Sequence, residues 1–398
     1  MMKSPFKSRS LDSLVPTEKP IVYGIVQAGE HVLDGVPYIR STDVGGRIDE
    51  TKLLKTSPMI AAKYSRSVVE PGDIVFSLRG NIGETSIVPE ILRGANLTQG
   101  TARISVSDKH DGRYVLYALR HTPVMRRILA VGKGSTFREI TLEDLRQIEV
   151  PSPPLPEQRK IADILSTWDE ALTQLDALIE AQERRKQALM QQLLTGKKRF
   201  PGFKAKWKTA SLGDVLEPIT RPTAKPQGKF LAAGIRSHGK GVFLKHDFIP
   251  ANIALDELFE LKTGDLVVNI TFAWEGAAAI VPPEADGALV SHRFPAFGFR
   301  EGKAARSFFR HYIRTHRFVF DCGLASPGGA GRNRVLSKSA FLDIELPLPP
   351  IEEQQKIGDI LDTADQQLTL LRTQRTALDQ QKRGLMQRLL TGKLRVKP

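Results

Sequence analysis

The chain has 398 residues, an apolar fraction of 41%, one cysteine and a formal net charge of +14. It has no run of 18 apolar residues and no hydrophobic signal core near its start, which argues against a membrane-spanning or secreted protein. The lone Cys322 cannot form an internal disulfide, so we expect a cytoplasmic protein and a buried structural thiol. The charge lies mainly on residues 1–152 (+4) and 201–348 (+6), and it favours a nucleic-acid partner over a merely solvated basic surface.

In chain order, residues 1–152 predict a first domain of mixed α/β structure. Runs rich in β-forming residues, bounded by turn residues, predict strands at 36–41, 74–78, 85–88 and 102–106. A helical run is predicted at 113–130. A loop containing Lys-Gly-Ser-Thr follows this run and leads toward a long helical segment.

Residues 153–199 predict one long helix. Its apolar residues recur in alternating steps of four and three, which is the 3.5-residue period of a coiled-coil seam rather than of a helix lying on a globular core. The predicted seam consists of Ile161, Leu165, Trp168, Leu172, Leu175, Ile179, Leu189 and Leu193. Polar residues such as Gln182 and Lys186 interrupt the seam, as residues that fix register do.

The same segment is written again near the C-terminus, so the chain is an internal tandem repeat. With a constant offset of 196, residues 349–395 match 153–199 at 25 of 47 positions. The second seam consists of Ile357, Leu361, Leu368, Leu371, Leu378, Leu385 and Leu389. Residues 200–348 form a second α/β domain that resembles a diverged copy of the first, and 349–398 form the second helix.

The charges predict how the two helices meet. In each helix acidic residues come first and basic residues follow, so only an antiparallel arrangement sets the acidic half of one against the basic half of the other. We therefore predict an α+β chain, with two α/β domains separated by two long helices that form an antiparallel coiled coil.

Three motifs carry a resemblance to a known family. Both helices open with P-x-x-E-Q-x-K-I and end with L-M-Q-x-L-L-T-G-K-x-R, and the domains share P-G-D-I and T-G-D-L strands. The chain thereby resembles, over nearly its whole length, the specificity subunits of type I restriction-modification systems. The resemblance implies two target-recognition domains, each reading half of a bipartite DNA site. It also implies helices that dock two methyltransferase subunits, which bind S-adenosylmethionine, and separate motor nuclease subunits that use ATP and Mg.

The residues themselves agree that catalysis lies elsewhere. The sequence has neither a DNA amino-methyltransferase motif nor a phosphate-binding G-x-x-x-x-G-K-[ST] loop, and its histidines and cysteine show no metal-ligand spacing. Asp256, Glu260 and Lys262 only faintly resemble a nuclease motif. Two alternatives remain open, namely a self-contained DNA-modifying enzyme and a coiled-coil scaffold without a nucleic-acid role.

Candidate DNA-contacting residues lie in loops that carry Arg, Asn and hydroxyl side chains, the groups that reach base edges and phosphates. The leading candidates occupy equivalent loops before the two helices and are Ser135, Thr136, Arg138, Arg332, Asn333 and Arg334. Weaker candidates are Arg79, Asn81, Phe272, Trp274, Ser291, His292 and Arg293. The alternative interpretation is that the loops are connectors with solvated charges, and that Trp274 belongs to a core.

Overall fold

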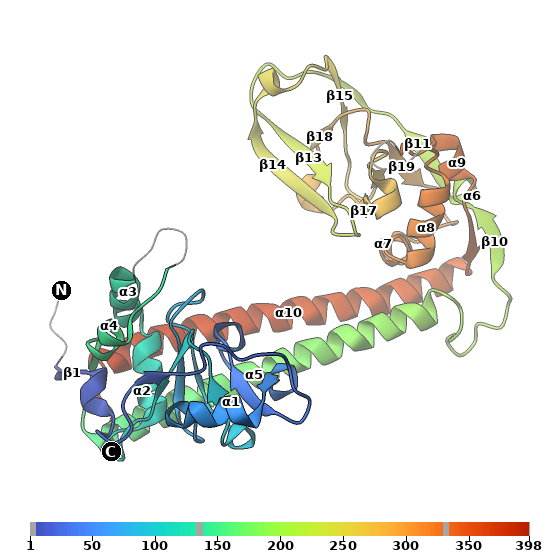
Figure 1. The fold of residues 1–398 in the computed structure, drawn as a ribbon. Coiled ribbons are helices and arrows are strands. Elements are labelled where there is room, and N and C mark those ends of the chain that lie inside the picture. The colour runs from blue at the N-terminus through green and yellow to red at the C-terminus, as the bar shows by residue number, and fades with distance from the viewer. Residues whose placement is uncertain (1–4, 133–137, 329–333, 398) are drawn as a thin grey trace. The chain divides into compact units, whose positions relative to one another are not determined.

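The computed structural model describes residues 5–132, 138–328 and 334–397. The chain divides into two compact units, Met1–Asp176 with Gln374–Pro398 (unit 1) and Ala177–Thr373 (unit 2). Two long helices, α5 (Leu155–Leu193) and α10 (Ile351–Leu390), each contribute one half to each unit (Figure 1). Within the described residues, no helix is long and apolar enough to cross a membrane.

Unit 1 contains two main sheets. One is antiparallel with strand order β2-β8-β5-β6, and the other has the order β4-β3-β7, in which β3 and β7 run parallel. The strands are β1 (Ser8–Ser10), β2 (Val22–Tyr23), β3 (Val36–Ile39), β4 (Leu54–Thr56), β5 (Ile74–Ser77), β6 (Thr85–Ile87), β7 (Asn96–Leu97), β8 (Thr101–Ile104) and β9 (Glu149–Pro151). All four strands predicted from the sequence are present.

The helices of unit 1 differ from the prediction at one point. They are α1 (Pro58–Lys63), α2 (Gly112–Arg120), α3 (Thr122–Val131) and α4 (Leu142–Arg146). The prediction of one uninterrupted helix over 113–130 was therefore wrong. The chain turns at His121 and starts a new helix, which has Pro123 in its first turn. Proline suits that position because the first turn leaves its backbone N–H groups unbonded.

The core of unit 1 includes the ends of both long helices. Ile161 and Leu165 of α5, with Leu389 and Leu390 of α10, pack in the same cluster as residues of β5, β8 and α2. At their ends the helices thus lie on a globular core, contrary to the sequence interpretation. An apolar stripe with a period of 3.5 residues and one with a period of 3.6 residues diverge by only about 20° per heptad. A few helical turns therefore cannot distinguish a coiled-coil helix from a helix on a globular core.

Unit 2 repeats this plan with a larger second sheet. An antiparallel sheet with order β11-β19-β16-β17 corresponds to the sheet β2-β8-β5-β6, and the other sheet has five strands in the order β12-β15-β18-β13-β14. The strands are β10 (Lys208–Ser211), β11 (Leu216–Ile219), β12 (Pro222–Ala224), β13 (Phe230–Ile235), β14 (Val242–Phe248), β15 (Glu257–Glu260), β16 (Leu266–Val268), β17 (Ala278–Ile280), β18 (Leu289–Val290), β19 (Ala296–Phe299) and β20 (Glu345–Leu348). The helices are α6 (Leu212–Val215), α7 (Arg306–Tyr312), α8 (His316–Leu324) and α9 (Lys338–Leu342).

The core of unit 2 is rich in aromatic rings. Phe308, Phe309, Tyr312 and Phe318 of α7 and α8 pack edge to face or stacked on one another. Cys322 is fully buried beside them, and burial raises the pKa of its thiol to about 12. Such a thiol is unreactive, so Cys322 packs as a small buried residue.

Candidate nucleic-acid interface and helical rods

We call residues 153–199 and 349–395 the two rods. In unit 1 their ion pairs join Glu157 to Arg395 at 2.7 Å, Asp169 to Lys382, and Asp176 to Arg375 at 3.0 Å. As residue numbers rise along the first rod they fall along the second, which makes the rods antiparallel (Figure 1). The pairing predicted from the charge gradients is confirmed.

The same ion pairs recur in unit 2. Glu353 forms an ion pair with Arg199 at 2.6 Å, and Asp365 forms one with Lys186. Glu353 and Asp365 are the residues equivalent to Glu157 and Asp169 of unit 1 at the offset of 196. Lys186, which interrupts the first predicted seam, therefore bonds across the rods, as do Arg375 and Lys382 of the second rod. A third contact in this unit, between Arg372 and Glu183, has no such counterpart.

The structure places all predicted seam residues in buried or half-buried positions. The fully buried ones at the rod ends also belong to the domain cores, as Ile357 and Leu361 do in unit 2. Leu172 and Leu368 lie nearer the middle and are buried as well.

A polar contact fastens each domain to its rod. In unit 1 the Tyr117 hydroxyl donates to Asp169 at 2.6 Å, and burial raises the pKa of Tyr117, so the phenol stays a donor. In unit 2 the fully buried His311 bonds Asp362 at 2.8 Å through its Nε2 atom, and burial lowers the pKa of His311. The rods therefore fix the orientation of the helix that follows the main sheet in each unit.

Unit 1 brings two of the predicted DNA-contacting residues together. Asn81 and Arg138 line one open depression of about 540 Å³, with Gly45 and Gly80. Arg79 forms an ion pair with Glu139 at 2.8 Å, so its charge is partly neutralised. The candidates Ser135 and Thr136 lie outside the described residues.

Unit 2 gathers a second group at the end of β16. The guanidinium of Arg334 lies 5.9 Å from the ring centre of Trp274, whose indole N–H donates to the Thr271 carbonyl at 3.1 Å. The backbone of Ile270 bonds both Arg293 and Leu336, so the Arg293 and Arg334 loops are neighbours. Trp274 is half-buried and not enclosed.

The remaining candidates of unit 2 are less closely grouped. His292 is exposed and lines a separate cavity with Arg221 and Lys338. Arg332 and Asn333 lie outside the described residues. Glu260 of the nuclease-like cluster is bonded to Lys262, and no group of three or more potential metal ligands occurs in the described part of the chain.

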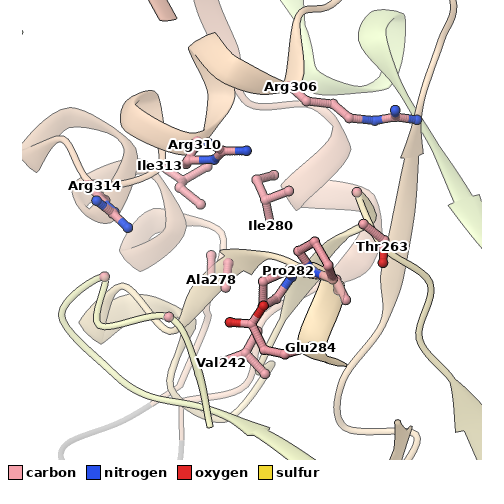
Figure 2. A pocket seen from close by; sticks show the side chains of 16 residues that line it. Val242, Thr263, Ala278, Ile280, Pro282, Glu284, Arg306, Arg310, Ile313 and Arg314 are labelled. Atoms are coloured by element: carbon pink, nitrogen blue, oxygen red, sulfur yellow. The ribbon is translucent and has the colours of Figure 1, made fainter. Parts of the chain in front are cut away.

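Sequence reasoning missed an arginine-lined cleft in unit 2. Arg306 and Arg310 of α7, with Arg314 just beyond it, are exposed and line one side of a cavity of about 560 Å³ (Figure 2). Arg310 is paired with Asp362 at 2.9 Å and Arg314 with Asp365 at 3.5 Å. The opposite side includes Ile280, Pro282 and Glu284. Arginines four residues apart in a helix were the signal that could have found it.

The chain thus has two mixed α/β domains with basic loops, and each domain is joined to one of two antiparallel rods. This architecture is that of a protein that presents two binding surfaces on a helical frame. The profile of a family described as the type I restriction modification DNA specificity domain matches residues 27–183 and again residues 204–380. The chain belongs to this family, as its motifs predicted. The two matches also confirm the tandem repeat.

Known relatives agree with this assignment. The type I restriction enzyme MjaVIII specificity subunit of Methanocaldococcus jannaschii is 22% identical over 98% of this chain and 97% of its own length. The type I restriction enzyme EcoBI specificity subunit of Escherichia coli is 34% identical, but over only 38% of this chain and 32% of its own length. The crystal structure of the type I restriction-modification S subunit from M. genitalium covers 97% of this chain and 96% of its own, with 17% identity and a TM-score of 0.61. At that identity the structural match shows the fold alone.

Proposed function

We propose that this chain is the DNA-recognition subunit of a type I restriction-modification complex and that each unit reads one half of a bipartite duplex site. The observation that carries the proposal is a repeated frame with unlike surfaces. The ion pairs that fasten the rods recur at an offset of 196, and Arg138 recurs as Arg334, but their surroundings differ. Asn81 lines the depression beside Arg138, whereas the Trp274 ring lies against Arg334. Two different surfaces on one frame suit a target with two different halves.

We further propose that the rods dock two methyltransferase subunits and that this chain performs no chemistry itself. The partner methyltransferase would bind S-adenosylmethionine, and motor nuclease subunits would use ATP and Mg. Support comes from the family, whose described domain concerns DNA specificity. The role of this chain is then to bind DNA and to position its partners.

The test is to express the chain with its methyltransferase partner and to map methylated sites by sequencing. Arg138→Ala should relax recognition in one half of the site, and Arg334→Ala should relax it in the other half, each by about 1–3 kcal/mol if these arginines read bases. Arg184→Ala removes an exposed charge from a rod and should leave recognition of both halves unchanged. If Arg138→Ala and Arg334→Ala each affected both halves of the site equally, the assignment of one half to each unit would be wrong.

Two results would favour the alternatives. Methylation or cleavage of DNA by the purified chain alone would indicate a self-contained enzyme. Binding of duplex DNA that does not weaken with salt, or no binding at all, would indicate a scaffold, because phosphate contacts release counterions and make affinity salt-dependent.

A further inference from the structure

The hairpin of β13 and β14 in unit 2 has a surface that none of the sequence motifs marked. β14 is the edge strand of the five-stranded sheet, and it pairs antiparallel with β13 through a short connection at 236–241. In this register Phe243 lies opposite Gly234, and Lys245 lies opposite Ala232. The hairpin is therefore a two-stranded ribbon with one free edge.

The two faces of the ribbon differ in character. Ala233, Ile235, Val242 and Leu244 pack into a hydrophobic cluster of unit 2. Because side chains alternate along a strand, Phe243 and Lys245 point to the opposite face. The Phe243 ring lies directly over Gly234, where a Cβ atom would come within 2.4 Å of the ring. The outer face thus needs glycine at this position.

Aromatic rings on the outer face hold two cations in place. The Arg236 guanidinium lies 5.4 Å from the centre of the Phe243 ring, and the Lys245 ammonium lies 5.7 Å from the same centre. Lys245 is also 5.3 Å from the ring centre of Phe248, which packs against Phe230 at 5.7 Å. Cation–π contacts restrict these side chains while leaving their charged ends exposed.

These cations make no ion pair within the described part of the chain. Among the residues that the structure describes, no carboxylate lies within ion-pair distance of Arg236, Lys245 or Lys240, which is exposed at the tip of the ribbon. Asp247 is the only acidic residue between 229 and 248. Two positive charges therefore lie on the outer face, and a third, that of Lys240, is exposed at the tip of the ribbon.

The equivalent strands of unit 1 are built differently. There β3 pairs antiparallel with β4 and parallel with β7, as β13 does with β14 and β18. In the segment between β3 and β4, Arg40 is paired with Asp43 and Lys52 with Asp49, both at 2.8 Å. Within the described residues 36–56 no cation lies over an aromatic ring, so the cations held by cation–π contacts on the β13–β14 ribbon are a feature of unit 2.

We propose that the outer face and the tip of the β13–β14 ribbon bind the phosphate backbone of duplex DNA through Arg236, Lys245 and Lys240. The inference rests on the proposed DNA-recognition function and adds a contact surface to it. Phosphate oxygens are bound mainly by Arg and Lys, and a two-stranded ribbon is narrow enough to enter the major groove. Gly239 in the same connection packs against Arg314, so the ribbon tip adjoins the arginine-lined cleft and extends its positive surface.

The experiment measures binding of the full chain to a fluorescent 40-base-pair duplex of mixed sequence over a range of salt concentrations. Each phosphate contact contributes about 0.9 to the slope of log affinity against log salt, so Arg236→Gln with Lys245→Gln should reduce the slope by about 1.8. The loss of affinity at 0.1 M salt should be on the order of tenfold or more. The matched control is Arg184→Gln with Arg383→Gln, which removes two exposed charges from the rods and should leave the slope nearly unchanged.

The outcomes separate this inference from the function on which it rests. If the unaltered chain shows no salt-dependent DNA binding, the proposed function itself fails. If the unaltered chain binds and the ribbon variant keeps its slope, the ribbon does not contact DNA and its lysines only protect a sheet edge from pairing. Should the double variant not fold, Lys240→Gln decides the matter, because this exposed tip residue should by itself reduce the slope by about 0.9.

Discussion

Glu353 should contribute more to stability than any other acidic residue of the rods. Its carboxylate is fully buried and accepts bonds from Arg199 Nε at 2.8 Å, Arg199 Nη2 at 2.6 Å and the Trp207 indole N–H at 3.0 Å. Glu353→Ala leaves a guanidinium whose side chain is only 22% exposed, and a half-buried indole, without that acceptor. Breaking a buried ion pair by removing one partner costs about 3–5 kcal/mol, and we expect a loss in that range.

The repeat provides comparison sites of graded burial. Glu157 accepts two bonds from Arg395 at 2.7 and 2.8 Å, but the Arg395 side chain is 55% exposed and water can replace the carboxylate. Glu157→Ala should therefore cost less, about 1–2 kcal/mol. Glu180 and Arg184 are both 70% exposed, so Glu180→Ala should change stability by less than about 0.5 kcal/mol.

The measurement is hydrogen exchange by mass spectrometry along a urea titration of the full chain. Peptides of β20 and the first half of α10 report on unit 2, and peptides of β9 and α2 report on unit 1, so the two losses are read separately. The double variant Arg199→Met with Glu353→Met removes both charges and should recover part of the stability. A loss for Glu353→Ala no larger than that for Glu180→Ala would refute the reasoning from burial.

Three further predictions concern the rods and the cores. Leu172→Asp combined with Leu368→Asp should part the rods and abolish assembly with the methyltransferase, and an intact complex on size-exclusion chromatography would contradict this. Burial lowers the pKa of His121 from 6.5 to about 4, so the unfolded chain binds the proton first and stability is lost as pH falls from 6.5 toward 4. Between pH 7 and 5.5 the free energy of unfolding, measured by thermal unfolding, should fall by about 1 kcal/mol, and His121→Gln should remove this pH dependence. A half-chain of residues 1–199 should form a weak symmetric dimer, detectable by sedimentation equilibrium.

The parts of the structure that the sequence predicted are those with long, repeated patterns. The seams extend over some 40 residues and occur twice, so the rods and their direction could be predicted from residue spacing and charge alone. The surface of the β13–β14 ribbon could not be predicted, because it depends on the register between the two strands. Phe243 faces Gly234 only through a register that strands of this length do not specify by themselves. The arginine spacing in α7 was visible, but its exposed face depends on how Phe308 and Phe309 pack.

The half-chain dimer should be weak because the rods repeat at their ends and differ in the middle. Residues 176–180 form the longest run without identity between the copies, and Asp176 of the first rod is replaced by Arg372 in the second. In an antiparallel pair of repeats, central residues are the ones that would meet their own copies in a symmetric dimer. Glu183 is bonded to Arg372 in the intact chain, whereas in a dimer of two half-chains it would face Asp176 of the other copy, twice over.

Like charges in contact oppose that dimer, so the middle of the rods favours the pairing of unlike halves. Asp176→Arg in residues 1–199 should restore the attraction at both places and tighten the dimer by about 1 kcal/mol or more, whereas Asp176→Asn should only relieve the repulsion. With the methyltransferase partner, the tightened dimer should modify a palindromic interrupted site, because it presents unit 1 twice in opposed orientation. If the Asp176→Arg half-chain dimerises no more tightly than the unaltered half-chain, the central charges do not determine which rods pair.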